Sequence, residues 1–214
     1  MKIKDPSLFE QPLNFVHQVK EGKHIVLFYE ELEYAKMISF QFIKAGLAHK
    51  KECSYLSEEE VEAVKREMTD IGVDVNKFTK NGLLHIYQVP SLPDYHPEDT
   101  QIEKKGGEGE DADSILKDPS KIGQTERIVL RCVYKINTED QIKSNLKWEH
   151  DYRLKSLKNL GASIVCTYPV NDIIPTISDA TGNSYGRWMN DLLEIYDGVI
   201  FARRFWKGVA FNLA

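Results

Sequence analysis

Cysteine is scarce in this chain, with only three among 214 residues. Cys53, Cys132 and Cys166 form no Cys-x-x-Cys pair, and each lies in a separate apolar segment. This spacing argues against a disulfide framework and against a cysteine-based metal site, and we expect buried, reduced thiols. The histidines also lack partners at metal-ligand spacing, so neither a metal nor another cofactor is predicted.

Long apolar runs are also missing, because no segment approaches the roughly 20 residues that cross a bilayer. The first 22 residues contain acids and lack the apolar core of a signal peptide, so we expect a cytoplasmic protein without membrane contact. The net charge of −5 is concentrated in residues 98–126, where nine acids face four lysines. Nothing in that balance indicates a nucleic-acid-binding surface.

Glycine is absent from the turn where an α/β protein usually holds phosphate. The pattern predicts a strand at 25–29, a helix at 31–45 that ends at Gly46, and a second strand at 52–56. The turn between the first strand and the helix, Tyr29–Glu33, has no glycine, lysine, serine or threonine, and it carries three carboxylates. Carboxylates repel phosphate, so a nucleotide held by its phosphates is not expected.

The rest of the chain continues the alternation of strands and helices. Ser57 and Glu60 form the pattern of a capping box for a helix that runs to Gly72. Later strands are predicted at 83–89, 127–134, 162–168, 199–204 and 208–213, with helices at about 138–160 and 185–196. The result is an α/β fold of one domain, residues 1–214, with a three-layer, mainly parallel sheet, helices on both faces and a C-terminal antiparallel hairpin.

Residues 91–126 interrupt this alternation. The segment is first rich in proline and then acidic and glycine-rich, without sustained periodicity. We interpret it as an insertion into the domain, which serves either as a solvated tether or as a specific binding segment.

The outline resembles the RecA/KaiC-type ATPases. The carrying segments are the first strand, the helix and second strand in FQFIKAGLAHKKECSYLSEEE, and the late DGVIFARRFW. Where that superfamily has a phosphate-binding loop of the form GxxxxGK[ST], this chain has FYEELEY. The departure points to a narrower relative within a RecA-like fold.

That relative is the MEDS family, the methanogen/methylotroph, DcmR-type sensory domains, which the chain resembles over about 24–89 and 127–213. The matching residues are Gly22-Lys23-His24 with IVLFYE, Gly46-Leu47, Cys53-Ser54-Tyr55-Leu56, Glu149 and Cys166-Thr167-Tyr168. The resemblance implies a non-catalytic sensory or regulatory domain that binds a small organic ligand. We expect the signal to leave through a separate protein partner or through oligomerisation.

Candidate site residues gather where strands of the parallel sheet end, because open α/β sheets bind ligands at the carboxyl ends of their strands. The residues expected there are Tyr29, Glu30, Ser57, Tyr134 and Tyr168. Such an edge suits an apolar or aromatic molecule oriented by a few hydroxyl and carboxylate groups. The alternative is that the tyrosines only pack at the strand ends, with their hydroxyls in solvent.

Three further residues complete the candidate set. Glu149 and Arg153 fall on the apolar stripe of the long helix at i, i+4, so they form either a structural ion pair or part of a site or switch. His24 opens the first strand at the opposite edge of the sheet, where a capping role competes with a ligand contact.

Two other functions remain open. In the first, the chain is a degenerate KaiC- or RecA-like subunit that acts as an interaction module in a homo- or hetero-oligomer, using Arg203, Arg204, Trp206 and Lys207 of the terminal hairpin. In the second, it is an enzyme that uses Glu149, Arg153 and the tyrosines for acid–base chemistry. We expect the non-catalytic sensory domain.

Overall fold

The computed structural model describes residues 11–89, 126–131, 145–147, 149, 161–170, 184–204 and 207–213. Most of the predicted insertion and of the helix at 138–160 lies outside these residues, as do Cys132, Tyr134 and Arg153. Within them, no helix is both long enough and apolar enough to cross a membrane.

Seven strands form one sheet in the order β3-β2-β4-β5-β1-β6-β7. The strands are β1 (His24–Tyr29), β2 (Cys53–Ser57), β3 (Leu84–Gln88), β4 (Arg127–Arg131), β5 (Ser163–Pro169), β6 (Gly198–Ala202) and β7 (Gly208–Asn212). All neighbours are parallel except β6 and β7, which pair antiparallel. The predicted parallel sheet with a C-terminal antiparallel hairpin is confirmed.

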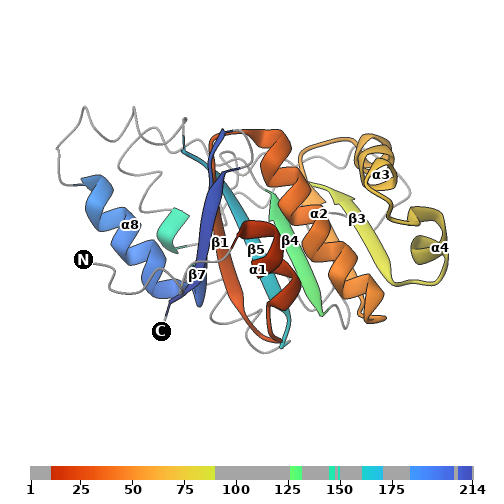
Figure 1. The fold of residues 1–214 in the computed structure, drawn as a ribbon, viewed down its shortest axis with the longest axis horizontal. Helices are drawn as coiled ribbons and strands as arrows, with labels where there is room; N and C mark the ends of the chain where they lie inside the picture. Colours follow the sequence, from red (N-terminus) through yellow and green to blue (C-terminus); the bar gives the residue numbers. More distant parts are fainter. Residues whose placement is uncertain are drawn as a thin grey trace, which may run out of the picture.

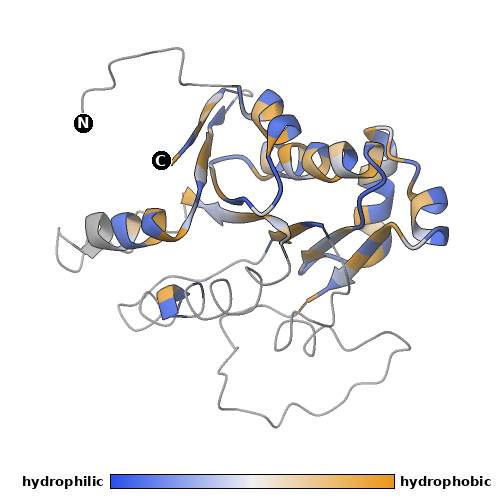
Figure 2. Ribbon diagram, turned by 90° about the horizontal axis from the view of Figure 1, so that it is seen from below, coloured by the Kyte–Doolittle hydropathy of each residue, from blue (hydrophilic) through white to orange (hydrophobic). Residues whose placement is uncertain are grey.

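Helices cover both faces of this sheet, as the sequence predicted. One face carries α1 (Pro12–Gln18), α2 (Leu32–Ala48), α3 (Val61–Asp70) and α4 (Val75–Lys80), and the other carries α8 (Ser184–Ile195) and the helical residues 145–147 and 149. Figure 1 shows α1 and α2 lying across the strands, and Figure 2 shows the two helical layers on opposite sides of the sheet. The two faces bury separate hydrophobic cores, and the strands supply alternate residues to each.

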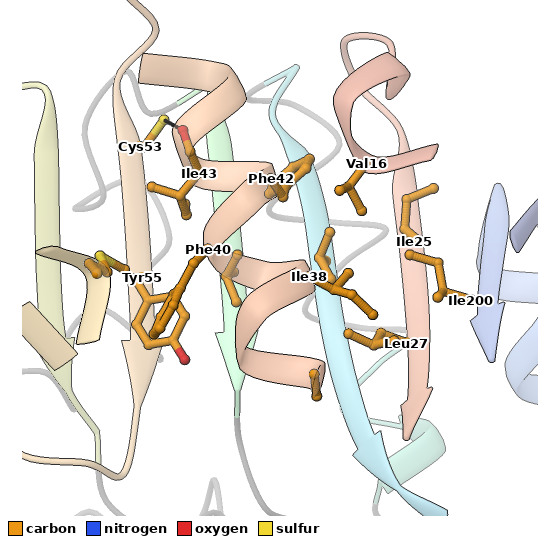
Figure 3. Packing of buried hydrophobic residues seen from close by; sticks show 14 of the residues in the cluster. Val16, Ile25, Leu27, Ile38, Phe40, Phe42, Ile43, Cys53, Tyr55 and Ile200 are labelled. Atoms are coloured by element: carbon orange, nitrogen blue, oxygen red, sulfur yellow. Dashed lines mark hydrogen bonds between the residues drawn. The ribbon is translucent and has the colours of Figure 1, made fainter. Parts of the chain in front are cut away.

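The helix α2 is the centre of the first core. Its apolar residues recur around almost the whole helix, and eleven of its residues are buried. Figure 3 shows Phe42 of α2 on the side of Val16 and Ile43 on the side of Cys53. The ring of Phe40 lies 5.3 Å from the ring of Tyr55 between centroids. The strand β1, which is buried on both faces, lies beneath this helix.

Gly46 does not end this helix, contrary to the prediction. The helix continues to Ala48, and Gly46 is buried inside it, next to Arg127 of β4 and Cys53 of β2. A Cβ atom at this position would lie 2.6 Å from Cδ of Arg127 and 2.7 Å from Sγ of Cys53. Glycine is therefore needed for close packing rather than for a positive φ angle.

The capping box predicted from Ser57 and Glu60 is also absent. Ser57 is the last residue of β2, and α3 begins at Val61 with Glu60 as its N-cap and no side-chain cap. The Ser57 hydroxyl instead accepts a hydrogen bond from the backbone N–H of Glu59 at 3.3 Å. Because β2 extends one residue further than predicted, Ser57 belongs to the strand and does not cap the helix.

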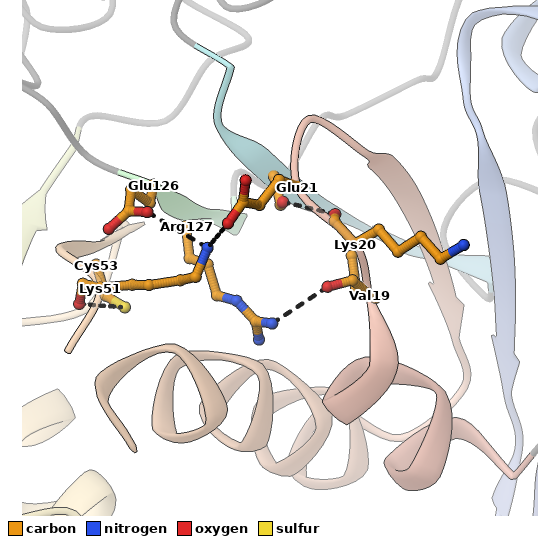
Figure 4. Close-up of polar contacts among 8 residues, drawn as sticks. Val19, Lys20, Glu21, Lys51, Cys53, Glu126 and Arg127 are labelled. Atoms are coloured by element: carbon orange, nitrogen blue, oxygen red, sulfur yellow. Dashed lines mark hydrogen bonds and ion pairs between the residues drawn. The ribbon is translucent and has the colours of Figure 1, made fainter. Parts of the chain in front are cut away.

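A buried arginine ties the amino ends of the strands to two helices. The guanidinium of Arg127 donates hydrogen bonds to the carbonyl oxygens of Phe42 at 2.8 Å, Val19 at 3.3 Å and Val16 at 3.5 Å, and it lies over the Phe42 ring. Beside it, Lys51 forms ion pairs with Glu21 and Glu126 (Figure 4). This network fixes α1 and α2 against β4.

The thiol of Cys53 lies in the same region and is expected to be inert in the folded protein. Burial raises its pKa to about 12, although the nearby Arg127 opposes the shift. The thiol is therefore protonated at pH 8, and the thiolate is the form that reacts. We predict that iodoacetamide labels Cys53 only after denaturation, as measured by mass spectrometry of the individual peptides. Labelling of the native protein at the unfolded rate would contradict this.

Candidate functional site

The parallel registers bring the carboxyl ends of six strands to one edge of the sheet. They place Tyr29 level with Pro169 and Ala202, and Ser57 level with Gln88 and Arg131. The start of α2 and the segment before α3 follow β1 and β2 at this edge. It is the edge at which open α/β sheets bind ligands.

The turn after β1 carries a carboxylate that holds two arginines. The backbone N–H of Glu30 donates to the carbonyl of Ala202 at 3.0 Å. Its carboxylate oxygens lie 3.1 Å from Nε of Arg203 and 3.5 Å from Nε of Arg204. The arginine side chains are 74% and 64% exposed, so these ion pairs contribute little to stability. The Glu30 carboxylate of this acidic turn therefore contacts the arginines of the terminal hairpin.

A group of charges lies further along the same edge, and we call Lys36, Glu59, Glu67 and Arg131 the Lys36 cluster. The two cations are buried, and the two carboxylates are partly exposed. The Lys36 ammonium lies 2.5 Å from Oε1 of Glu59 and 2.9 Å from Oε1 of Glu67. The Arg131 guanidinium lies 2.8 Å from Oε2 of Glu59. Burial disfavours the charged ammonium, but the hydrogen bonds and charges of Glu59 and Glu67 outweigh it and raise the pKa of Lys36. Lysine is therefore a charged group at any physiological pH.

Four polar atoms in and around the Lys36 cluster have no hydrogen-bond partner among the described residues. They are the hydroxyls of Ser39 and Tyr55, Nε of Arg131, and Oε2 of Glu59, which meets Nη2 of Arg131 as an ion pair. Ser39 lies one turn after Lys36 on α2, and Tyr55 points from β2 toward the same face of the sheet. The Tyr55 hydroxyl lies near the Arg131 guanidinium without an aligned hydrogen bond, and burial raises its pKa. Buried polar groups are normally paired, so these atoms could form further hydrogen bonds to a ligand.

Glu149, which the sequence placed on the apolar stripe of the long helix, lies on the other face of the sheet. Its side chain is fully buried and accepts hydrogen bonds from the hydroxyls of Tyr168 and of Tyr196, the latter at 3.1 Å. The Tyr168 hydroxyl in turn accepts from Nδ2 of Asn145 at 3.2 Å. The rings of Phe28 and Trp188 surround Tyr168, so the carboxylate belongs to a buried, aromatic-lined network.

The sheet separates several residues that the sequence analysis placed together. Tyr29 belongs to the core under α2, whereas Tyr168 belongs to the opposite core, so these two side chains do not converge. Tyr168 is instead brought to Glu149. Tyr29, Glu30 and Ser57 do lie at the carboxyl edge, whereas the positions of Tyr134 and Arg153 fall outside the described residues.

His24 lies at the amino edge, as predicted, and its backbone is held there by Asp197. The His24 N–H donates to the Asp197 carboxylate at 3.0 Å, and the Asp197 N–H donates to the His24 carbonyl at 2.8 Å. Burial would raise the pKa of Asp197, but hydrogen bonds from Lys23 and from the His24 N–H lower it. His24 is therefore at the opposite end of β1 from Glu30.

Sequence reasoning missed the Lys36 cluster. Its only signals were a lysine on a helix with almost no polar face and an arginine inside the apolar run 127–134. The residues of the cluster come from separate segments, and a single sequence does not show that these segments are in contact. In the residues that the structure describes, no group of three histidine, cysteine or acidic side chains could hold a metal ion.

Comparisons with known proteins identify relatives of this arrangement. The family model named MEDS, for methanogen/methylotroph, DcmR sensory domain, matches residues 23–181. Among solved structures, the crystal structure of a KaiC-like protein from the hyperthermophilic archaeon Pyrococcus horikoshii OT3 is similar, with a TM-score of 0.57 and 15% identity over 94% of this chain and 77% of that chain. At that identity the likeness shows the fold, which is RecA-like. The curated proteins gave no match.

Proposed function

Because the chain belongs to the MEDS family of sensory domains, we propose that it binds a small organic ligand at the carboxyl edge of the sheet and passes the bound state to a separate protein partner. No chemical step is required of it in this role. The residues that we assign to this edge are those around the Lys36 cluster, together with Tyr29, Glu30 and Ser57.

One observation carries the proposal for the site. The hydroxyls of Tyr55 and Ser39 and Nε of Arg131 are buried without partners among the described residues, at the edge where this class of fold receives ligands. An unpaired buried polar group costs about 1–3 kcal/mol, and a ligand that pairs with it recovers that cost. Phe40 and the ring of Tyr55 supply apolar surface beside these groups.

The turn Tyr29–Glu33 supports a ligand other than a nucleotide. It offers a phosphate no glycine, lysine or hydroxyl, and the Glu30 carboxylate already holds the two arginines near it. A phosphate at this turn would meet negative charge at the end of α2 that normally attracts anions.

The second candidate function is an interaction module within a KaiC-like assembly. The observation in its favour is the exposure of Arg203 and Arg204 on the hairpin of β6 and β7. Their contact with Glu30 in the same chain competes with donation to a neighbouring subunit. Light scattering distinguishes the two, because the module requires a ring-sized assembly and the sensor does not.

Thermal unfolding in the presence of candidate ligands tests the sensory proposal. We expect millimolar MgATP and MgADP to leave the melting temperature unchanged and at least one class of small organic molecules to raise it. A ligand at about ten times its Kd stabilises the folded protein by about 1.4 kcal/mol, which raises the melting temperature by about 3–6 °C in a domain of this size. A magnesium-dependent increase with ATP, and none with organic molecules, would overturn the proposal.

A further inference from the structure

We infer that Lys36 and Arg131 form a binding site for a carboxylate, that the side chain of Glu59 occupies this site in the ligand-free protein, and that a small monocarboxylic acid is the ligand that displaces it. This inference rests on the proposed sensory function and names the class of its ligand. It is carried by the geometry of Glu59 between two buried cations.

Both oxygens of the Glu59 carboxylate are used, each by a different cation. Oε1 lies 2.5 Å from Nζ of Lys36 on α2, and Oε2 lies 2.8 Å from Nη2 of Arg131 at the end of β4. Lysine and arginine are the side chains by which proteins recognise carboxylates, although Oε2 of Glu59 meets Arg131 as an ion pair without an aligned hydrogen bond. A free carboxylate has the same two oxygens and can take the same two positions.

The two cations lie on regular elements of the fold, whereas the Glu59 carboxylate lies on a connecting segment. The side chains of Lys36 and Arg131 are 7% and 5% exposed and come from a buried helix and a central strand. Glu59 is 24% exposed and belongs to the short segment between β2 and α3. A competitor can therefore approach from the side of Glu59 without disturbing the core.

Charge balance selects the class of competitor. The two cations Lys36 and Arg131 are matched by the two carboxylates of Glu59 and Glu67. Removal of Glu59 alone would leave a buried cation without its counter-ion, which is costly. A monocarboxylate restores the balance, whereas an alcohol or an amide does not, and a phosphate dianion adds an excess charge. The unpartnered hydroxyls of Tyr55 and Ser39 then serve polar groups on the body of the acid.

The same exchange provides a route for the signal. Lys36 is bound by Glu59, just before α3, and by Glu67 on α3 itself. Displacement of Glu59 removes one of these two contacts and releases the segment that leads into α3. The position of α3 then depends on the ligand, as a sensory domain requires.

Isothermal titration with sodium acetate, butyrate and benzoate tests the inference, with the corresponding primary alcohols and amides as uncharged controls at constant ionic strength. Glu59→Gln should bind at least one of these acids about tenfold or more tightly than the wild type does, because the internal competitor is removed. Lys36→Met should weaken binding by at least about tenfold. Glu62→Gln, which changes an exposed carboxylate of α3 that pairs with Lys65, should leave it unchanged.

The outcomes separate this inference from the proposed function. Binding of alcohols or amides but not of acids overturns the carboxylate site and leaves a sensory domain. Equal or weaker binding of the acids by Glu59→Gln than by the wild type also overturns it, and this result does not depend on whether Lys36→Met folds. If none of these molecules binds to the wild type or to Glu59→Gln, the carboxylate site is overturned, whereas the nucleotide result described above overturns the proposed sensory function.

Discussion

Replacing Arg127 with methionine is expected to lower the free energy of unfolding by about 2–4 kcal/mol. The guanidinium is 5% exposed and donates to carbonyl oxygens of Val16, Val19 and Phe42, and it lies 4.5 Å from the centre of the Phe42 ring. Methionine has a similar length but donates no hydrogen bond, so the hydrogen bonds that join α1 and α2 to β4 through this side chain are lost. Urea denaturation followed by circular dichroism measures the change.

Arg66→Met is the matched control for this substitution. Arg66 is exposed on α3, so the same chemical change should alter the free energy of unfolding by no more than about 0.5 kcal/mol. A similar small effect for Arg127→Met would contradict the role that we assign to the buried guanidinium.

Tyr168→Phe is expected to cost about 1.5–3 kcal/mol of stability. The hydroxyl that it removes donates to the buried carboxylate of Glu149 and accepts from Asn145. Glu149 is fully buried and cannot turn to water, so loss of this hydrogen bond leaves its carboxyl group with fewer donors. Chemical denaturation again gives the value.

Tyr55→Phe provides the comparison, because Tyr55 is equally buried but its hydroxyl has no aligned hydrogen bond among the described residues. Removing it should change the free energy of unfolding by less than about 0.5 kcal/mol. Equal costs for the two tyrosines would mean that Tyr55 has a partner in the ligand-free protein, and the site would lose its main support.

The sequence was sufficient for the sheet and its layers, because strong local patterns specify them. The continuous apolar run at Ile25–Tyr29 predicts a strand buried on both faces, as observed. The almost fully apolar segment after it predicts a largely buried helix, and eleven residues of α2 are buried. Gly46 was misjudged because the same residue serves a helix end and a close helix–sheet approach. The second use depends on Arg127, which is 81 residues away in the chain.

The site was harder to predict, because it depends on register and on contacts between distant segments. Strand ends were located from the pattern, but a difference of one residue sends a side chain to the other face of the sheet. This is why Tyr29 and Tyr168 were expected together, although the register places Tyr168 level with Phe28. Lys36, Glu59 and Arg131 come from three separate elements, and only the fold brings them into contact.

Amide hydrogen exchange of the full chain, with and without the tightest-binding small organic molecule, distinguishes a ligand site at the Lys36 cluster from a nucleotide site. We expect exchange to slow in residues 32–39 and 55–67, around Lys36 and the segment that leads into α3. Protection by MgATP centred on Tyr29–Glu33, with no effect of organic molecules at α3, would contradict this expectation.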